Sequence, residues 1–385
     1  MQIPHTPVFP PEEFAGRLAR LQAELERRGV DLFLAFARES VFYLTGYQTY
    51  AGRTFQVLLV PRRGSPTLFV RYLESYLAAL YAAGTEVVTY DDHEDPLERL
   101  ADEVTRRAAN RRGVALEETA PAMHAANRRR LGQLLAGFDL ADGSGAVERL
   151  RRVKSDREVA RMRQAAAWTA LGMRAAIDAC AVGATENDVA AAAMAAMVRA
   201  GSEYFPIDPI VTSGYRAGVP HTTFERRRLE PNDTVLLEMT ACCGRYIAPL
   251  MRAVSLGEPP AETRRMFGLC REGLERAIAS MRPGAAAEDV DRACQTVMVE
   301  AGVYESFRKR TGYSAGFAFP PGWNEGHIIS LRKGDATSLE PGMVFHMPPA
   351  LRDYGVGCVG VSETVLVTPG GCEPLTEFPR ELFVR

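Results

Sequence analysis

HTTFERRRLEPNDTVLLEMTACCGRYIAPLMR, residues 221–252, contains the densest set of structural signals in the chain. A turn at residues 230–233 precedes the apolar run Thr234–Leu237, which predicts a buried strand. That run ends on Glu238, and a second strand is predicted over Arg245–Arg252. Because burying a lone carboxylate is costly, Glu238 is either a paired acid of the core or a functional group with a perturbed pKa.

The second half of the chain contains an internal repeat. Three segments recur in the same order: Gly183–Val189 with Gly284–Val290, Met197–Gly201 with Met298–Gly302, and Leu229–Pro231 with Leu339–Pro341. Each unit is typical of a helix, a capped second helix that ends at glycine, and then strands. Two such units related by a pseudo-twofold axis would place their sheets side by side with helices outside. A pocket between the two halves is then expected.

Composition and charge exclude several classes of protein. The 385 residues are 46% hydrophobic and 24% charged, which is enough for two domains with separate cores. A net charge of -2 without a basic stripe predicts no nucleic-acid partner. The chain has no apolar run of about eighteen residues, and its start lacks a signal-peptide pattern, so no membrane association is predicted. Seven scattered cysteines without a CxxC pair favour a reduced, cytoplasmic setting.

The first part of the chain alternates helical and strand patterns. Pro11–Arg28 predicts an amphipathic helix that ends at Gly29, and strands are predicted at Val30–Phe36, Phe55–Pro61, Pro66–Val70 and Val87–Tyr90. This alternation predicts an α/β layer. No glycine-rich loop opens a helix, so nucleotide binding is not predicted. A charged helix entry near residues 144–152 marks a boundary, which gives predicted domains 1–150 and 151–385.

Several of these features resemble the pita-bread hydrolases, the family of methionine aminopeptidase, prolidase, aminopeptidase P, creatinase and ectoine hydrolase. The resemblance rests on His221, the Leu229–Asp233 turn, the acid that ends the strand, and Gly244–Arg252. A Leu-Thr-Gly-Tyr element at residues 44–47 is similar to one in the creatinase-type N-terminal domain. The resemblance implies an α+β protein, with a creatinase-type α/β N-terminal domain followed by a pita-bread domain with a pseudo-twofold repeat.

The peptidases of this family hold two metal ions on two Asp, one His and two Glu, and this sequence departs from that set. Carried over one by one, the five positions fall on Glu238, Pro249, Tyr313, Pro348 or its neighbourhood, and Ser362. At most one position therefore keeps a carboxylate. Two closely spaced cations need several anionic oxygen ligands, and proline has no side chain that can ligate. We expect neither a metal nor another cofactor.

The substitutions are most similar to those of the metal-independent ectoine hydrolase branch. The shared elements are Arg245-Tyr246, Pro249-Leu250, Arg252, Gly312-Tyr313-Ser314, Gly316, Pro320-Pro321, Trp323, Ile329–Arg332, Gly334-Asp335, Leu339–Met343, Phe345-His346 and Ser362-Glu363. In creatinase, by contrast, glutamates bind the substrate at positions that here are Met251 and Val361. That difference argues against creatine as the substrate.

The candidate catalytic residues are Glu238 and His221. Glu238 could attack an electrophilic carbon or position a water molecule, because carboxylates serve as nucleophiles and as bases. His221 stands where the family keeps a histidine, and a neutral imidazole can move a proton in either direction. The structural alternative for Glu238 is a core acid whose hydrogen bonds are satisfied by the protein. The structural alternative for His221 is a histidine in a surface loop.

The candidate substrate-binding residues are Tyr313, Glu363, Trp323, His346 and Tyr47. The Tyr313 phenol could donate a hydrogen bond to a developing anion, and Trp323 could form a wall of the pocket. Glu363 could pair with a cationic substrate nitrogen or orient the catalytic histidine. His346 is the weaker candidate. Tyr47 lies in the N-terminal domain, which the resemblance implies helps to shape the pocket, often across a dimer. The structural alternatives are aromatic packing for Tyr313 and a salt bridge for Glu363.

The sequence leaves three functional hypotheses. The first is a metal-independent hydrolase that opens a C–N bond in a small cyclic amidine or amide, where a cationic amidinium supplies its own electrophilic charge. The second is a metal-dependent Xaa-Pro dipeptidase, and the third is a non-catalytic peptidase-like binding protein. We expect a homodimer with a small-molecule substrate and with no nucleic-acid or membrane partner.

Overall fold

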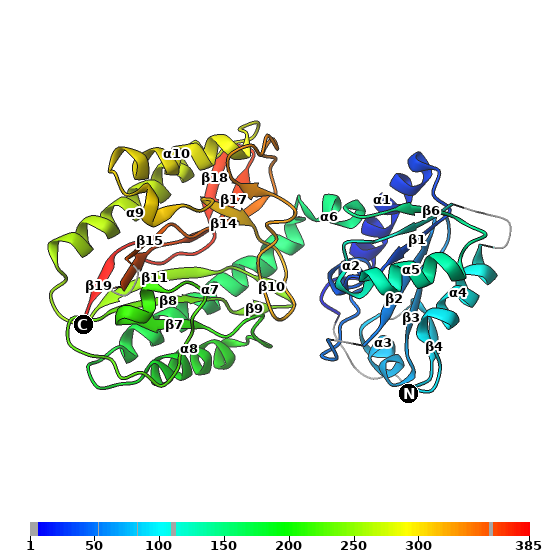
Figure 1. Ribbon diagram of the computed structural model, residues 1–385, viewed down its shortest axis with the longest axis horizontal. Coiled ribbons are helices and arrows are strands. Elements are labelled where there is room, and N and C mark those ends of the chain that lie inside the picture. The colour runs from blue at the N-terminus through cyan, green and yellow to red at the C-terminus, as the bar shows by residue number, and fades with distance from the viewer. Residues whose placement is uncertain (1–6, 53, 83, 109–112, 354–356) are drawn as a thin grey trace. The chain divides into compact units, whose positions relative to one another are not determined.

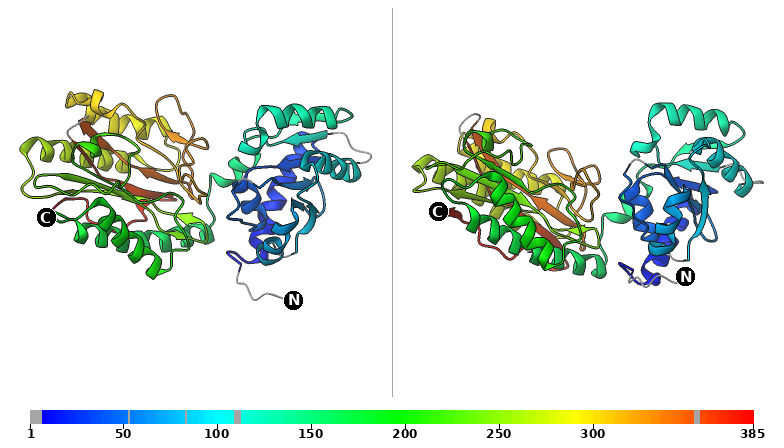
Figure 2. Two further views of the ribbon diagram at one scale, coloured as in Figure 1. Left: turned by 60° about the horizontal axis from the view of Figure 1, so that its bottom comes forward. Right: turned by 90° about the horizontal axis from the view of Figure 1, so that it is seen from below.

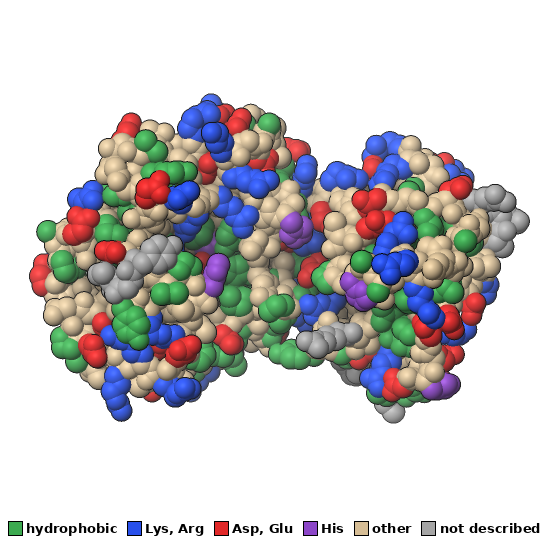
Figure 3. All heavy atoms as spheres, viewed as in Figure 1, with side chains coloured by type: hydrophobic (Ala, Val, Ile, Leu, Met, Phe, Trp, Pro, Cys, Tyr) green, Lys and Arg blue, Asp and Glu red, His purple; other side chains and the backbone are tan. Residues whose placement is uncertain are grey.

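The computed structural model describes residues 7–52, 54–82, 84–108, 113–353 and 357–385. The chain forms two compact units that divide after Arg151 (Figure 1). Within the described residues, no helix is long and apolar enough to cross a membrane. On the face seen in Figure 3, acidic and basic side chains are intermixed on both units.

The N-terminal unit is built on one mixed sheet of six strands, in the order β4-β3-β2-β1-β5-β6. The strands are β1 (Leu32–Ala35), β2 (Gln56–Pro61), β3 (Thr67–Arg71), β4 (Glu86–Tyr90), β5 (Gly113–Leu116) and β6 (Asp139–Asp142). The helices are α1 (Pro11–Arg28), α2 (Arg38–Thr45), α3 (Ser75–Tyr81), α4 (Pro96–Arg107), α5 (Ala125–Leu134) and α6 (Ala146–Arg151). Helix α1 buries Leu21 and Leu25, and it ends at Gly29, whose φ of 67° suits a residue without Cβ.

The C-terminal unit contains a four-stranded and a five-stranded sheet, each with its own pair of helices, and two smaller two-stranded sheets. The first half comprises α7 (Asp156–Ala179), α8 (Glu186–Ala200), β7 (Ile210–Ser213), β8 (Thr234–Met239), β9 (Cys242–Cys243), β10 (Tyr246–Ile247) and β11 (Leu250–Ser255). The second comprises α9 (Ala261–Ser280), α10 (Ala287–Glu300), α11 (Tyr304–Phe307), β12 (Gly312–Ser314), β13 (Ser330–Leu331), β14 (Val344–Met347), β15 (Ala350–Asp353), β16 (Gly357–Gly360), β17 (Glu363–Thr368), β18 (Gly371–Pro374) and β19 (Leu382–Val384).

The two halves are arranged alike. The sheet order is β19-β11-β8-β7 in one sheet and β13-β12-β14-β17-β18 in the other. Helices α7 and α8 pack together on one side, and α9 and α10 pack together on the other. The views in Figure 2 agree that these helices lie outside and the strands lie between them.

The predicted repeat is visible in matching backbone hydrogen bonds. In the first half, Gly183 N–H donates to Leu229 O at 2.9 Å, and Leu229 N–H donates to Ala184 O at 2.8 Å. In the second half, Gly284 N–H donates to Leu339 O at 2.9 Å, and Leu339 N–H donates to Ala285 O at 2.8 Å. Each glycine-alanine turn before a helix is thus paired to the Leu-Glu-Pro turn before a strand. The pseudo-twofold repeat is confirmed.

One predicted strand is interrupted. Arg245–Arg252 was expected to be continuous, but β10 ends at Ile247 and β11 begins at Leu250. Pro249 has no N–H to give to a ladder, which accounts for the break. The preceding Ala248 N–H donates to Thr240 Oγ1 at 3.1 Å. The freed Pro249 carbonyl accepts a hydrogen bond from Thr364 Oγ1 at 2.8 Å.

Arg252 holds the two halves together at the point where β11 meets β17. Its side chain is fully buried, and all five guanidinium hydrogens have acceptors. The acceptors are the carbonyls of Met251, Ser362, Phe378 and Pro379 and the Glu363 carboxylate, at 2.6–2.9 Å. Glu363 is buried as well, and it also accepts from Arg380 Nε at 3.0 Å and from the Thr376 hydroxyl. Removing one partner of a buried ion pair such as Arg252–Glu363 is costly, because the other charge is then left buried without a counter-charge.

We predict that Glu363→Ala destabilises the C-terminal unit by about 3–5 kcal/mol, because it leaves the Arg252 guanidinium buried without a counter-charge. Urea unfolding followed by tryptophan fluorescence measures this, since both tryptophans, Trp168 and Trp323, lie in that unit. The matched control is Glu262→Ala, which removes an exposed Glu–Arg pair on α9 and should cost less than about 1 kcal/mol. Equal effects of the two substitutions would contradict the prediction.

Candidate active site

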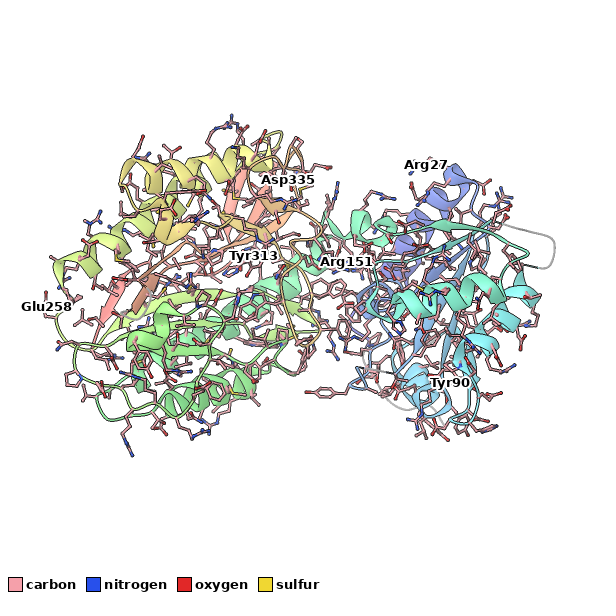
Figure 4. The ribbon with its side chains drawn as sticks, viewed as in Figure 1. Arg27, Tyr90, Arg151, Glu258, Tyr313 and Asp335 are labelled. Carbon is pink, nitrogen blue, oxygen red and sulfur yellow. The ribbon has the colours of Figure 1, made fainter. Side chains whose placement is uncertain are left out.

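A cavity of about 700 Å³ opens within the C-terminal unit, and residues from both halves line it. The first half contributes Ile207, Ile210, Thr212, Ala217, Val219–Thr222, Leu236, Glu238 and Met251. The second contributes Glu305–Arg310, Tyr313, Pro321–Asn324, Pro348 and Arg352. Figure 4 shows Tyr313 in the interior of the unit, between the helical layers of the two halves. Of the predicted site residues, the cavity brings together Glu238, His221, Tyr313 and Trp323.

Glu238 points into the cavity because of strand alternation. Along β8, Val235, Leu237 and Met239 face the core under α7 and α8, whereas Leu236 and Glu238 face the opposite side. Glu238 is half-buried, and it lines the cavity. Burial raises the pKa of Glu238, and the positive charges of Lys309 and Arg352 oppose that rise. Glu238 therefore differs from a solvated surface acid, and its predicted catalytic role stays a prediction.

The Tyr313 hydroxyl is fixed by a chain of hydrogen bonds that runs away from the cavity. Trp323 Nε1 donates to the Tyr313 oxygen at 3.0 Å, and His346 Nδ1 lies 2.9 Å from that oxygen. His346 Nε2 lies 2.8 Å from Ser362 Oγ, which accepts a hydrogen bond from the Met251 N–H at 2.7 Å. Burial lowers the pKa of His346 to about 3, so its ring is neutral and carries one N–H.

One arrangement of protons gives the Ser362 hydroxyl and the His346 N–H an acceptor each within this hydrogen-bonded network. The Ser362 hydroxyl donates to Nε2 of His346, and the Nδ1–H donates to the Tyr313 oxygen. The phenol then accepts twice, from His346 and Trp323, and its own hydrogen is left for the cavity. The opposite tautomer leaves the Ser362 hydroxyl hydrogen without an acceptor among the described residues. Burial also raises the pKa of Tyr313, which keeps the phenol protonated and able to donate.

Two cationic residues of the cavity were not predicted from the sequence. Lys309 follows α11, and its Nζ donates to the Pro348 carbonyl at 2.6 Å. Burial, together with the like charge of Arg352 on β15, lowers the pKa of Lys309 to about 8, and the charge of Glu238 opposes that shift. The sequence signal that could have indicated Lys309 was the basic run at residues 308–310, but such a run by itself is typical of a solvated surface.

His221 lies on the exposed side of the cavity wall, after the short helix Gly214–Gly218. The buried Glu186 carboxylate fixes that helix by accepting from Ser213 N–H at 2.9 Å and from the Arg216 guanidinium. The next residue, Thr222, donates through its hydroxyl to Val219 O at 3.0 Å. The backbone of His221 has a φ of 61°, in the left-handed region. The imidazole is therefore held on a shaped turn that keeps contact with solvent.

Three predicted substrate-binding residues lie elsewhere. Glu363 is fully buried in the Arg252 ion pair and does not line the cavity, so its salt-bridge alternative is the one observed. His346 lies behind Tyr313 and orients it rather than contacting the cavity. Tyr47 is buried in the N-terminal unit, where its hydroxyl donates to Glu74 at 3.2 Å. Glu363 and His346 are satisfied by protein partners within the C-terminal unit, which is the physical reason that they do not face the cavity. The role of Tyr47, which was expected to act across a dimer, stays a prediction.

The described residues do not supply a two-metal site. They contain no group of three or more His, Cys, Asp or Glu side chains that could hold a metal ion. The position expected for one glutamate ligand is Pro348, whose carbonyl accepts from the Lys309 ammonium. Ser362, at the position of another, is engaged with His346. An ammonium group at this place would repel a divalent cation, so the donor set does not fit the dinuclear centre.

Comparisons with known proteins agree with this architecture. The model of Metallopeptidase family M24 matches residues 160–369, and that of the Creatinase/Prolidase N-terminal domain matches residues 17–153. The chain is 30% identical over 390 residues to an uncharacterized hydrolase/peptidase of Sinorhizobium fredii. It is 29% identical over 398 residues to the ectoine hydrolase of Halomonas elongata, and both matches cover 98% of each chain.

A dipeptidase of Mycobacterium ulcerans has the same fold, with a TM-score of 0.84 at 26% identity over 98% of this chain and 99% of that one. The chain belongs to the M24 family, with a creatinase-type N-terminal domain. It is a hydrolase of that family, and both the resemblance and the fold class predicted from the sequence are confirmed.

We predict a specific acid sensitivity from His346. Below pH about 6.5 the unfolded chain protonates this histidine, whereas the folded chain, with a pKa of about 3, does not. The unfolded state then binds more protons, so stability falls as the pH falls, by about 1.4 kcal/mol per pH unit. Between pH 7.5 and 5 the loss attributable to His346 is about 2 kcal/mol.

Urea unfolding of His346→Gln at the two pH values tests this, because the variant should lose about 2 kcal/mol less than the wild type over that interval. The control is His327→Gln, which removes an exposed histidine of the same unit. That variant should follow the wild-type pH dependence. A His346→Gln protein with an unchanged pH dependence would show that the buried imidazole is not neutral.

Proposed function

We propose that this chain is a hydrolase that opens a C–N bond in a small cyclic amidine or amide, using side chains in place of bound metals. The observation that supports this most is the replacement of the metal ligands around Glu238 by a phenol, prolines, a serine and the Lys309 ammonium. The similarity to an ectoine hydrolase over nearly the whole chain points to the same class of substrate.

In the proposed reaction, Glu238 acts on the electrophilic ring carbon. It either attacks that carbon directly, or removes a proton from a water molecule that attacks it. Tyr313 donates a hydrogen bond to the charge that develops as the carbon becomes tetrahedral. The C–N bond then breaks, and the departing nitrogen takes a proton. On the direct route, a water molecule then hydrolyses the bond between the substrate carbon and Glu238, which regenerates the carboxylate. His221, which has access to both cavity and solvent, returns protons between the two. Trp323 forms a wall of the cavity and holds the Tyr313 oxygen.

A second candidate is a metal-dependent Xaa-Pro dipeptidase. The observation that favours it is the structural similarity to the Mycobacterium ulcerans dipeptidase. This candidate requires that activity depends on an added divalent metal. The donor set around Glu238 disfavours it, since Lys309 takes the place where an anionic ligand is needed.

We predict that purified protein turns over cyclic amidines in the presence of a chelator, and that Glu238→Gln lowers kcat by about 10²–10⁴-fold. The glutamine keeps the size of the side chain but removes the base. The matched control is Glu305→Gln, an exposed acid on the cavity rim, which should retain activity. Stoichiometric bound metal on which activity depends would establish the dipeptidase alternative. Folded protein without turnover of any C–N substrate would favour a binding protein.

A further inference from the structure

One buried carboxylate holds both ends of the His221 loop, which comprises residues 213–225. Glu186 is the first residue of α8, and its side chain is fully buried. One carboxylate oxygen accepts hydrogen bonds from the Ser213 N–H at 2.9 Å and from the Ser213 hydroxyl at 2.8 Å. The other oxygen accepts from the Glu225 N–H at 3.0 Å. The same side chain therefore fixes the loop where it leaves β7 and where it returns.

Arg216 extends this hold to the middle of the loop. Its guanidinium is buried in an ion pair with Glu186, and it donates to the Thr223 carbonyl at 2.7 Å. The hydroxyl of Thr222, the residue after His221, donates to the Arg216 carbonyl at 3.3 Å. The backbone of His221 is left-handed, a conformation that such a residue keeps only where its surroundings impose it. The contacts that begin at Glu186 supply this constraint.

The internal repeat shows that the helix entry itself does not need the carboxylate. In the repeat, Glu186 corresponds to Ala287 of the second half. The backbone contact is the same at both places: the Glu186 N–H donates to Arg227 O at 2.9 Å, and the Ala287 N–H donates to Thr337 O at 2.9 Å. An alanine is thus sufficient for the start of the helix and its pairing with the neighbouring turn. The first half adds a carboxylate at this position, and its loop carries His221.

We propose that Glu186 is a positioning residue for His221, acting through Arg216 and the two ends of the loop. The proposal rests on the proposed function, in which the imidazole moves protons at the cavity. Without the carboxylate, the guanidinium loses its counter-charge and the loop ends lose their shared acceptor, so that the imidazole samples several positions. A small displacement of a proton-transferring group slows the chemical step, whereas substrate binding by the other cavity walls changes little.

The first test needs no substrate. Isotope labelling at histidine Cε1 gives an NMR signal for each of the six histidines, and His221→Gln assigns the relevant one. Glu186→Gln keeps the size of the side chain and removes its charge. It should shift or broaden the His221 signal and leave the other signals unchanged. Trypsin should cut the same variant at residues 226–228 about tenfold faster, because cleavage follows the open population of the adjoining loop.

The matched control is Asp188→Ala, which removes the capping acid of the same helix. Asp188 is exposed and accepts from the N–H and the hydroxyl of Thr185, so its hydrogen bonds lie outside the His221 loop. The control should lower the melting temperature and leave the His221 signal and the trypsin cleavage as in the wild type. If Glu186→Gln does not fold, Glu186→Asp, which keeps the charge on a shorter side chain, should give the same changes at smaller size.

The second test measures turnover of a tetrahydropyrimidine by the full chain. Glu186→Gln should lower kcat by about 10–100-fold with KM nearly unchanged, and Glu186→Asp should recover part of that loss. Asp188→Ala should keep the wild-type kcat. The decisive variant combines Glu186→Gln with His221→Gln. If Glu186 acts through His221, the double variant is no slower than His221→Gln alone, because the two losses are not additive.

The outcomes separate this positioning role from the proposed function. A Glu186→Gln protein whose His221 signal and trypsin cleavage match the wild type overturns the proposal. Additive losses of kcat in the double variant also overturn it, since Glu186 would then not act through the imidazole. Changes in all histidine signals, shared by Asp188→Ala, would show a general loss of stability and overturn it as well. A wild type without turnover contradicts the proposed function alone, and the His221 signal still decides whether Glu186 places the imidazole.

Discussion

The rest of the C-terminal unit depends on the hydrogen bonds and the ion pair that the buried Arg252 guanidinium forms. The guanidinium takes its acceptors from β11, from the start of β17 and from the segment at residues 378–379, which are far apart in the sequence. Next to it, the Ser362 N–H donates to Met251 O at 3.1 Å. These contacts fix the edge at which the duplicated halves meet. The cavity lies beside that edge, so the same residues that join the halves also set the shape of the site.

The charge of the site differs from that of a two-metal centre, because basic and neutral side chains stand where anionic ligands would be needed. The M24 family is named for metallopeptidases, and two divalent ions in such a fold require a cluster of anionic ligands. Here Glu238 keeps a carboxylate, while its surroundings supply Lys309, Arg352 and a neutral phenol. In our proposal, these side chains take the part that bound metal ions play in the metallopeptidases. The fold itself is shared with the dipeptidase of Mycobacterium ulcerans.

The sequence allowed much of this to be predicted, for identifiable reasons. The turn and capping motifs are duplicated in the amino-acid sequence itself, so the two halves could be recognised without knowledge of any contact. Glu238 and Tyr313, which both line the cavity, could be singled out because each changes residue type at an expected position. Glu363 was misplaced because a buried acid at a strand end looks the same in sequence whether it faces a substrate or an arginine.

Lys309 and Arg352 were missed for the opposite reason. Basic residues are common on surfaces, and no pattern along the chain marks the ones that turn inward. Lys309 becomes informative only when its ammonium is found against the Pro348 carbonyl, and Arg352 only when it is found on the cavity wall. Both observations depend on residues far away in the sequence. The orientation of these two side chains is determined by tertiary packing and not by a periodic pattern in the sequence.

The hydrogen-bond chain behind Tyr313 has a fixed polarity. It begins at the Met251 peptide N–H, which can only donate, and continues through Ser362 and His346 to the phenol. Because the imidazole resists protonation, ordinary changes of acidity do not reverse the relay. In this arrangement of protons the Tyr313 phenol has a hydrogen to donate toward the cavity. In the proposed reaction, such a donor would stabilise an atom that gains electron density and would not stabilise one that loses it.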